Sequence, residues 1–188
     1  MPNADKSLPA KPAYFVYFDS TDLHLCPDVG RHYVSIGKQK KTDSPGLNNP
    51  WKALFGSLIY PTGEGVYTIH EHKRHQEVRA HLKELMAIDP NGFFIVAMDN
   101  ASAHQTPQLN PFWEEHKDRL YPCFLPTYSP HLNLIERLWR FMRGQITKDQ
   151  YYETLARLCQ AVVEWFEKVP FSEFCSLMGV KESDLGLV

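Results

Sequence analysis

The stretch of the chain that most constrains its fold begins with an apolar run over residues 93–98 and ends at Arg143. The apolar run stops abruptly at Asp99 and Asn100. A short apolar run that ends in turn residues indicates a buried strand. Open α/β sheets bind their ligands at the carboxyl ends of such strands, so Asp99 is a candidate site residue.

A helix is predicted downstream of this strand, after a second apolar run over residues 120–125 and a turn-rich loop over residues 126–130. Ser129 or Asn133 is its candidate cap. Its apolar face consists of Leu134, Ile135, Leu138, Trp139 and Met142, which recur at helical spacing. Glu136 falls at the edge of that face, with Arg140 and Arg143 on the same side.

The start of the chain repeats the pattern of apolar strand and aspartate. The run over residues 13–18 stops at Asp19 and Ser20, and Asp22 is a nearby alternative for the same role. Two strands that end in aspartate can lie side by side, and a helix that packs beside them can add Glu136. Carboxylates delivered in this way can share a divalent metal, because Mg²⁺ prefers oxygen ligands.

The remaining elements complete an α/β pattern with one mixed sheet. Further strands are predicted over residues 33–37, 51–60 and 66–70, and helices over residues 74–89, 107–118 and 151–168, with a short one after residue 170. The predicted domain covers residues 13–178. Residues 1–12 are predicted to be a disordered leader and residues 179–188 a flexible tail.

Composition narrows the class of protein. The chain has 188 residues, 43% of them hydrophobic, which suffices for one domain with a real core. A net charge of −2 excludes a globally basic nucleic-acid binder, so any DNA contact must come from local patches. No apolar run approaches the length of a membrane span. Four widely spaced cysteines argue against a zinc ribbon and fit reduced thiols in a cytosolic protein.

Three segments together closely resemble the catalytic core of DDE transposases, in the bacterial insertion-sequence branch related to the mariner superfamily. They are residues 99–101 with His104, residues 125–130, and residues 133–139. The separation of 37 positions between Asp99 and Glu136 is close to the one that this family uses. The segment that follows Asp19 resembles the first catalytic motif, although Ser20 stands where similar members more often have Glu.

This resemblance implies a ribonuclease H-like fold, with a central mixed sheet flanked by helices. It also implies a transposase that performs metal-dependent phosphoryl transfer on DNA. Asp19, Asp99 and Glu136 would hold two Mg²⁺ or Mn²⁺ ions, for hydrolysis at the ends of the insertion element and strand transfer into target DNA. The candidate phosphate contacts are Lys38, Lys40, Lys41, Arg137, Arg140 and Arg143. His104 is either close to the substrate or a hydrogen-bonded structural histidine.

The expected partners are therefore the element ends and the target DNA, with a homodimer as one possible assembly. The expected location is the bacterial cytoplasm, in association with the nucleoid. Members of this family normally carry helix-turn-helix domains ahead of the catalytic region. The chain is thus expected to be a catalytic fragment, a split-frame product or a truncated descendant. Two other functions stay open: a ribonuclease H-like nuclease without strand transfer, and a non-catalytic remnant.

Overall fold

A five-stranded mixed sheet forms the centre of the protein, in a computed structural model that describes residues 11–30, 33, 35–38, 41–44, 46, 48–127 and 129–181. The strands are β1 (Ala13–His24), β2 (Trp51–Tyr60), β3 (Gly65–His70), β4 (Phe93–Met98) and β5 (Leu120–Phe124). Their order across the sheet is β3-β2-β1-β4-β5. The first three strands are antiparallel, whereas β4 and β5 run parallel to β1.

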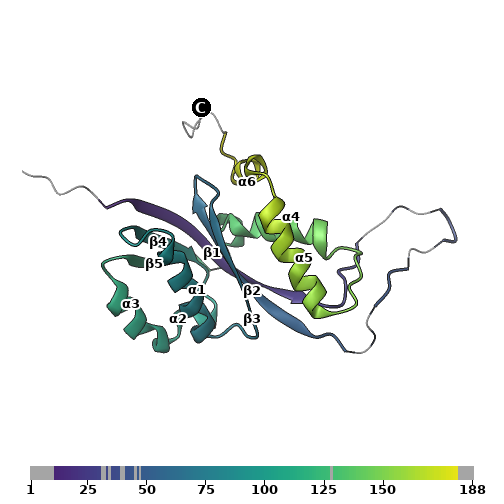
Figure 1. Ribbon diagram of the computed structural model, residues 1–188, viewed down its shortest axis with the longest axis horizontal. Helices are drawn as coiled ribbons and strands as arrows, with labels where there is room; N and C mark the ends of the chain where they lie inside the picture. The colour runs from purple at the N-terminus through teal and green to yellow at the C-terminus, as the bar shows by residue number, and fades with distance from the viewer. Residues whose placement is uncertain are drawn as a thin grey trace, which may run out of the picture.

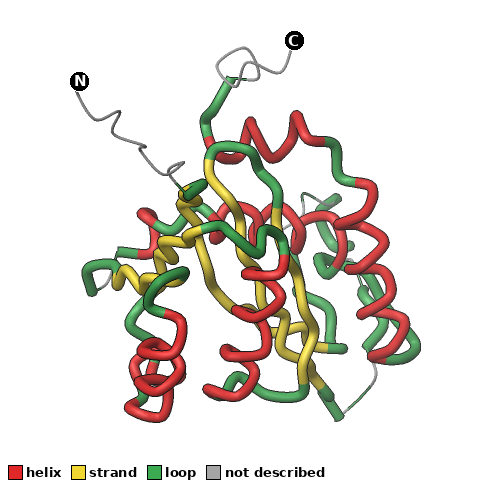
Figure 2. Tube along the Cα trace, turned by 60° about the vertical axis from the view of Figure 1, so that its left-hand side comes forward, coloured by secondary structure: helices red, strands yellow, loops and turns green. Residues whose placement is uncertain are grey.

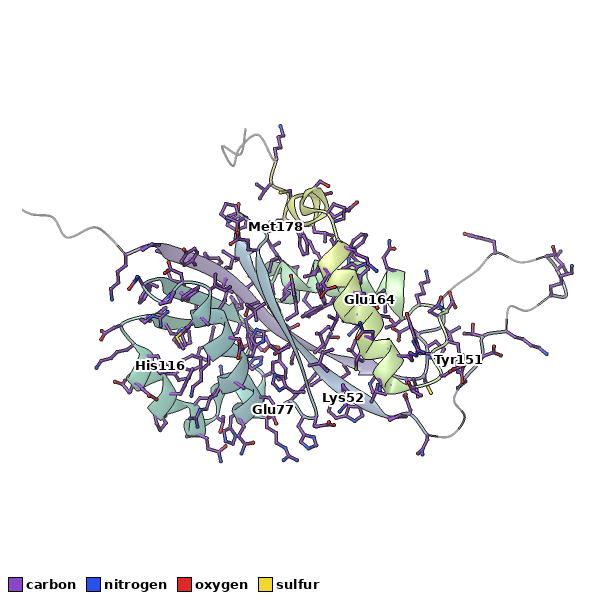
Figure 3. The ribbon with its side chains drawn as sticks, in the orientation of Figure 1. Lys52, Glu77, His116, Tyr151, Glu164 and Met178 are labelled. Carbon is purple, nitrogen blue, oxygen red and sulfur yellow. The ribbon has the colours of Figure 1, made fainter. Side chains whose placement is uncertain are left out.

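Helices cover both faces of this sheet (Figure 1). One layer contains α1 (His75–Ala87), α2 (Ser102–Gln105), the 3₁₀ turn η1 (Pro107–Leu109) and α3 (Asn110–His116). The other contains η2 (Pro130–Leu132), α4 (Ile135–Ile146), α5 (Leu155–Lys168) and α6 (Phe171–Met178). Figure 2 shows the yellow strands between red helices, and the labels on His116 of α3 and Glu164 of α5 mark the two layers in Figure 3. This arrangement confirms the predicted mixed sheet flanked by helices.

The alternation of side chains along the strands produces two cores. Val16 and Phe18 of β1 pack toward α1, in the same core as Val78 and Leu82. Leu23 of β1 instead belongs to the core beneath α4, α5 and α6. Since successive strand residues point to opposite faces, odd-numbered positions of β1 from 17 to 23 face the α4 layer. Within the described residues, no helix has both the length and the apolar character needed to cross a membrane.

The strand predicted over residues 33–37 is wrong. Among the described residues of that segment, Tyr33 and Ser35–Gly37 belong to no strand, and Val34 lies outside the described part. Tyr33 and Ile36 are fully exposed, and the amide of Lys38 donates to the carbonyl oxygen of Ser35 in a turn. Gly37 adopts a φ of 84°, a left-handed conformation that turns the chain and interrupts an extended strand.

The first strand is longer than predicted. It continues past Asp19 to His24, because β2 pairs with it until His24 lies opposite Trp51. Asp19 therefore stands inside a strand, and only the pairing with β4 ends nearby, after Tyr17 and Ala97.

Helix boundaries also differ from those predicted. Leu134 occupies the cap position of α4, with no side-chain cap, so neither Ser129 nor Asn133 caps the helix. The side-chain amide of Asn133 instead donates to the carbonyl oxygen of Phe18. Helix α5 begins at Leu155 rather than at residue 151, since the Thr154 hydroxyl accepts the amide of Arg157 and caps it there. The helix expected over residues 107–118 forms as η1 and α3, and α2 was not predicted.

Candidate functional site

The sheet register brings two aspartates to the same opening. Pairing between β1 and β4 ends with Tyr17 opposite Ala97, after which β4 terminates at Met98. Extending that register by two positions places Asp19 beside Asp99. Both residues lie on the face covered by α4, because side chains alternate along each strand. The split between β1 and β4 thus forms an opening with a carboxylate from each strand at its edge.

The start of α4 is tied to β1 next to Asp19. The side-chain Nδ2 atom of Asn133 donates to the carbonyl oxygen of Phe18 over 3.0 Å. The backbone carbonyl oxygen of Asn133 accepts the backbone amide of Glu136. Asn133 thereby joins the residue before Asp19 to the first turn of α4, which carries Glu136. Asp19, Asp99 and Glu136, the three carboxylates expected to converge, line one cavity of about 340 Å³. The other lining residues are Asn100, Ala101, Leu125, Pro126, Thr127, Ser129 and Asn133.

Strand alternation distinguishes Asp19 from its neighbour Asp22. Asp22 faces the α1 layer, where the Lys73 ammonium lies 2.9 Å from its Oδ1 atom. Lys73 also donates to the carbonyl oxygen of Ser20 over 3.2 Å. Asp22 is therefore neutralised by an ion pair on the opposite face of the sheet and does not line the cavity.

Asp19 is a buried carboxylate in a negatively charged setting. Its residue is 9% exposed, and its Oδ2 atom accepts a hydrogen bond of 3.1 Å from Nε1 of Trp139. Burial raises the pKa of Asp19 to about 6, and the charges of Glu136 and Asp99 act in the same direction. Loss of water and repulsion between carboxylates both oppose its negative charge, so a cation in the cavity would stabilise the ionised form.

Asp99 has the opposite electrostatic setting. Its Oδ1 atom lies 2.7 Å from Nδ1 of His104 and also accepts the amide of Ala101 over 3.1 Å. The hydrogen bond with His104 lowers the pKa of Asp99. His104 itself is only 2% exposed and packs against Phe18. It therefore orients Asp99 from within the core and does not line the cavity. This geometry favours the structural alternative for His104.

The side chains around the cavity fit a divalent cation. Carboxylate oxygens are the ligands that Mg²⁺ and Mn²⁺ prefer, and no described residue that lines the cavity is cationic. The buried Oδ1 atom of Asn133 has no hydrogen-bond partner, which leaves one further oxygen unsatisfied at this place. In the described part of the chain, no three His, Cys, Asp or Glu side chains converge closely enough to form a complete metal cluster. The carboxylates share a cavity that phosphate oxygens and water would complete, as is usual for Mg²⁺.

The predicted phosphate contacts divide into three groups. Arg140 and Arg143 line a second cavity of about 470 Å³, in which Glu136 and Lys148 also take part. Arg143 is held against β1 by a hydrogen bond to the Thr21 hydroxyl. This second cavity therefore adjoins the first one at Glu136.

The other predicted contacts that the structure describes do not lie at either cavity. Arg137 is turned toward α6, where it donates to the carbonyl oxygen of Leu177. Lys38 and Lys41 are exposed in the segment between β1 and β2, and Lys40 lies outside the described residues. Neither described lysine lines the two cavities at Glu136.

Two further residues that act on the site carboxylates were not singled out from the sequence. Trp139 was assigned only to the apolar face of its helix, but a buried indole N–H needs an acceptor, and Asp19 provides it. Lys73 lies close enough to Asp99 to help lower the pKa of that carboxyl. The sequence around Lys73 does not predict this position. Lys73 follows β3, and only the order of strands in the sheet determines which residues lie near it.

Comparison with known proteins identifies relatives of the whole region that forms the site. Residues 14–159 match the family model described as DDE superfamily endonuclease. An uncharacterized 39 kDa protein of insertion element IS630 from Shigella sonnei is 29% identical over 157 residues, which cover 82% of this chain and 45% of that protein. An uncharacterized protein of Sinorhizobium fredii is 29% identical over 117 residues, covering 59% of this chain and 82% of that protein.

Solved structures share the fold. The Mos1 mariner paired-end complex with Mn superposes with a TM-score of 0.69 at 18% identity, over 88% of this chain and 51% of that one. The catalytic domain of the Mos1 mariner transposase gives a TM-score of 0.59 at 13% identity, over 88% and 75%. The fold is therefore the ribonuclease H-like one expected. The chain spans less than half of the insertion-element protein and about half of the longer transposase chain.

Proposed function

The chain belongs to the DDE superfamily endonucleases, and from this premise we propose that it is the catalytic domain of a transposase that cuts and joins DNA at insertion-element ends. The substrate in this proposal is the phosphodiester backbone of DNA. Asp19, Asp99 and Glu136 hold two Mg²⁺ or Mn²⁺ ions. The names of the similar proteins support divalent metal and transposon-end DNA for those relatives.

The observation that carries the proposal is the shared cavity of the three carboxylates. They come from β1, from the loop after β4 and from α4, and they line one cavity although 117 positions separate the first from the last. Surface charges seldom gather in this way, because like charges repel and Asp19 is almost fully buried. In the described part of the chain, Glu136 forms no ion pair with Arg140, as it would if it were only a helical surface residue.

The residues take distinct parts in the proposed reaction. The metal ions that these residues would hold would supply activation of the nucleophile and stabilisation of the leaving oxygen. Asp19 and Glu136, which both line the cavity, would supply oxygen ligands, and His104 holds Asp99 in place by a hydrogen bond to the Asp99 Oδ1 atom. The protein itself moves no proton at a defined atom in this scheme, because positioning and charge neutralisation dominate phosphoryl transfer.

The adjoining cavity provides a path for the DNA backbone. Arg140, Arg143 and Lys148 line it, and Glu136 lies between it and the carboxylate cavity. A strand whose reacting phosphate sits among the carboxylates would place a neighbouring phosphate against these cations. The DNA partner, the possible homodimer and a separate DNA-recognition domain all belong to the proposal. So does the bacterial cytoplasm as the place of action.

Cleavage and strand transfer can be measured separately. Supercoiled plasmid incubated with the protein and Mn²⁺ should be nicked, and EDTA should abolish the nicking. A pre-cut duplex that carries the DNA flanking the coding sequence should then be joined to the plasmid through its 3′-hydroxyl. Nicking without joining would favour a nuclease over a transposase. If purified, folded protein neither nicks nor joins with Mn²⁺ or Mg²⁺ after its DNA-recognition domain is supplied, the chain is a non-catalytic remnant.

A further inference from the structure

A tryptophan of α4 contacts one of the site carboxylates directly. Trp139 is 1% exposed, and its Nε1 atom donates to Oδ2 of Asp19 over 3.1 Å. The bond joins two buried side chains that are 120 positions apart in the chain. A carboxylate that accepts a bond from a rigid donor has less freedom to rotate than one that faces only solvent.

The sheet leaves room for this tryptophan at one position. Asp19 pairs with Gly56 of β2, which in turn pairs with Tyr67 of β3, so the three form a row across the sheet. A Cβ atom at Gly56 would lie 2.8 Å from Cζ2 of Trp139 and 2.9 Å from Cδ1 of Ile135. Contacts that close are not tolerated, so only glycine allows the indole to lie over the strand and reach Asp19.

Aromatic neighbours fix the plane of the indole. The rings of Tyr67 and Phe166 meet Trp139 edge-on, with centroids 6.5 and 6.4 Å away. Tyr67 and Phe166 also stack on each other at 3.7 Å, so they form one block against the indole. The direction of the Nε1–H bond is therefore set by the packing of α4 and α5 on the sheet and not by the metal site.

The same helix carries a carboxylate one turn earlier. Glu136 and Trp139 are three positions apart in α4, and residues at that spacing lie on the same side of a helix. Helix α4 thus delivers Glu136 to the cavity and contacts Asp19 through Trp139. Any shift of the helix would move both groups together.

We propose that Trp139 is a positioning residue, whose indole N–H fixes the Asp19 carboxylate in the orientation in which Asp19 and Glu136 hold a divalent cation. The inference rests on the proposed function, since it concerns the same metal site. It assigns to Trp139 a role beyond its volume in the core. Residues that hydrogen-bond to metal ligands typically contribute 10- to 100-fold to metal affinity.

The test compares two tryptophans of the same core. Trp139→Phe keeps a large ring but removes the N–H group, and Trp165→Phe makes the same change on α5, where the ring packs on Phe141 and Phe166. Binding of Mn²⁺ is titrated by electron paramagnetic resonance, which reports the free ion without any catalytic turnover. We expect about 10- to 100-fold weaker Mn²⁺ binding in Trp139→Phe and unchanged binding in Trp165→Phe. Equal affinity in a folded Trp139→Phe protein overturns the inference.

A second variant and a second measurement cover the remaining outcomes. If Trp139→Phe does not fold, benzothienylalanine at position 139 keeps the size of the indole and replaces only the N–H group by sulfur, and it is judged by the same criterion. Crystal structures of the unsubstituted and substituted proteins show whether the Asp19 carboxylate turns. If the unsubstituted protein binds no Mn²⁺ even with duplex DNA present, or binds it equally after Asp19→Asn, the proposed function fails. The positioning role then fails as well if the Asp19 carboxylate has not turned.

Discussion

Two clusters of buried polar side chains lie on opposite faces of the same sheet. On the α1 side, His81 is fully buried between two hydroxyl groups, with Ser57 Oγ 2.9 Å from its Nε2 atom and Thr68 Oγ1 2.7 Å from its Nδ1 atom. Thr68 also contacts Nε2 of His70 over 2.9 Å. On the α4 side, Asp19 and its neighbouring carboxylates line an open cavity.

The two clusters differ in whether their charges and hydrogen bonds are balanced. Burial lowers the pKa of His81 to about 3, so the ring is neutral, and each of its nitrogen atoms has a hydroxyl partner. Burial raises the pKa of Asp19 to about 6, and the nearest charged groups at the cavity are other carboxylates. The His81 cluster is complete within the protein, whereas Asp19 lies buried among other carboxylates and a cation in the cavity would balance its charge. This contrast separates a structural polar cluster from a candidate active site.

The largest expected effect is loss of activity in Glu136→Gln. The variant keeps the size of the side chain but removes one negative charge from the cavity, and close metal ions need that charge to offset their repulsion. We expect Mn²⁺-dependent nicking to fall by about 10³-fold or more, because a metal ion contributes several kcal/mol to such reactions. Stability in urea should be unchanged or higher, since a repulsive charge is gone. Retained nicking activity would remove Glu136 from the site and, with it, most of the case for a DDE enzyme.

The reverse pattern is expected for the other cluster. His81→Leu leaves the buried Ser57 and Thr68 hydroxyls without their partner, and each buried unsatisfied group costs about 1–3 kcal/mol. Urea unfolding should show a loss of roughly 2–5 kcal/mol in the free energy of unfolding. The fraction that remains folded should nick DNA at the normal rate. A stable His81→Leu protein would contradict the view that this cluster supports the fold.

Acid should reveal His81 in the unsubstituted protein. Its pKa is about 3 in the folded protein and 6.5 for a free histidine, so between these values the unfolded chain binds the extra proton. The stabilising contribution of neutral His81 is thus present above pH 6.5 and declines as the pH falls toward 3, by at most about 1.4 kcal/mol per pH unit. Asp19 has the opposite sign, because its raised pKa favours the folded state as the pH falls below 6. The measurement is the difference in the free energy of unfolding between the unsubstituted and His81→Leu proteins at each pH. Asp19 contributes equally to both proteins, so its effect cancels in this difference. A difference that does not change with pH would contradict the assignment.

Part of this contrast could be predicted from the sequence. Asp99 and Glu136 follow from an apolar run that ends in turn residues and from a helix with a clear apolar face, and both line the cavity. Asp19 was grouped with these two residues for a partly wrong reason, although it lines the same cavity. Its strand does not end there, and only the end of pairing with β4 exposes it. The end of one strand beside another is a property of the sheet, which local sequence does not contain.

Contacts between distant segments could not be predicted in the same way. The bond from Trp139 to Asp19 depends on Gly56, which lies on a third segment and resembles any glycine in a strand. The His81 cluster depends on the order β3-β2-β1 and on the side of the sheet that α1 covers. The Trp139–Asp19 bond and the His81 cluster each join residues of a helix and of the sheet. Which of these residues meet depends on how the helices pack on the sheet. Single-segment patterns show which residues are buried but not which buried residues meet.

The smallest expected effect concerns the rim of the site. Arg140 is exposed and lines the cavity next to Glu136, without belonging to the carboxylate cluster. Arg140→Ala should weaken DNA binding by less than about 1 kcal/mol and reduce the slope of log affinity against log salt by about 1, since one phosphate contact is lost. The affinity of the unsubstituted chain for DNA should itself be low, because its net charge is −2. This affinity should fall steeply with salt, because it comes from phosphate contacts.

The matched control for this rim position is Arg157→Ala, which removes an exposed arginine from α5, away from both cavities. Fluorescence anisotropy with a short duplex at several salt concentrations measures both slopes, and Mn²⁺ binding is titrated in parallel. Arg140→Ala should change only the DNA slope, because a cation at the rim screens phosphate but supplies no ligand to a metal. Equal slopes for the two variants would place the DNA elsewhere on the protein. Tighter Mn²⁺ binding in Arg140→Ala would instead show that the balance of charge in the cavity extends beyond the carboxylates to this arginine, because a lost positive charge no longer repels the metal ion.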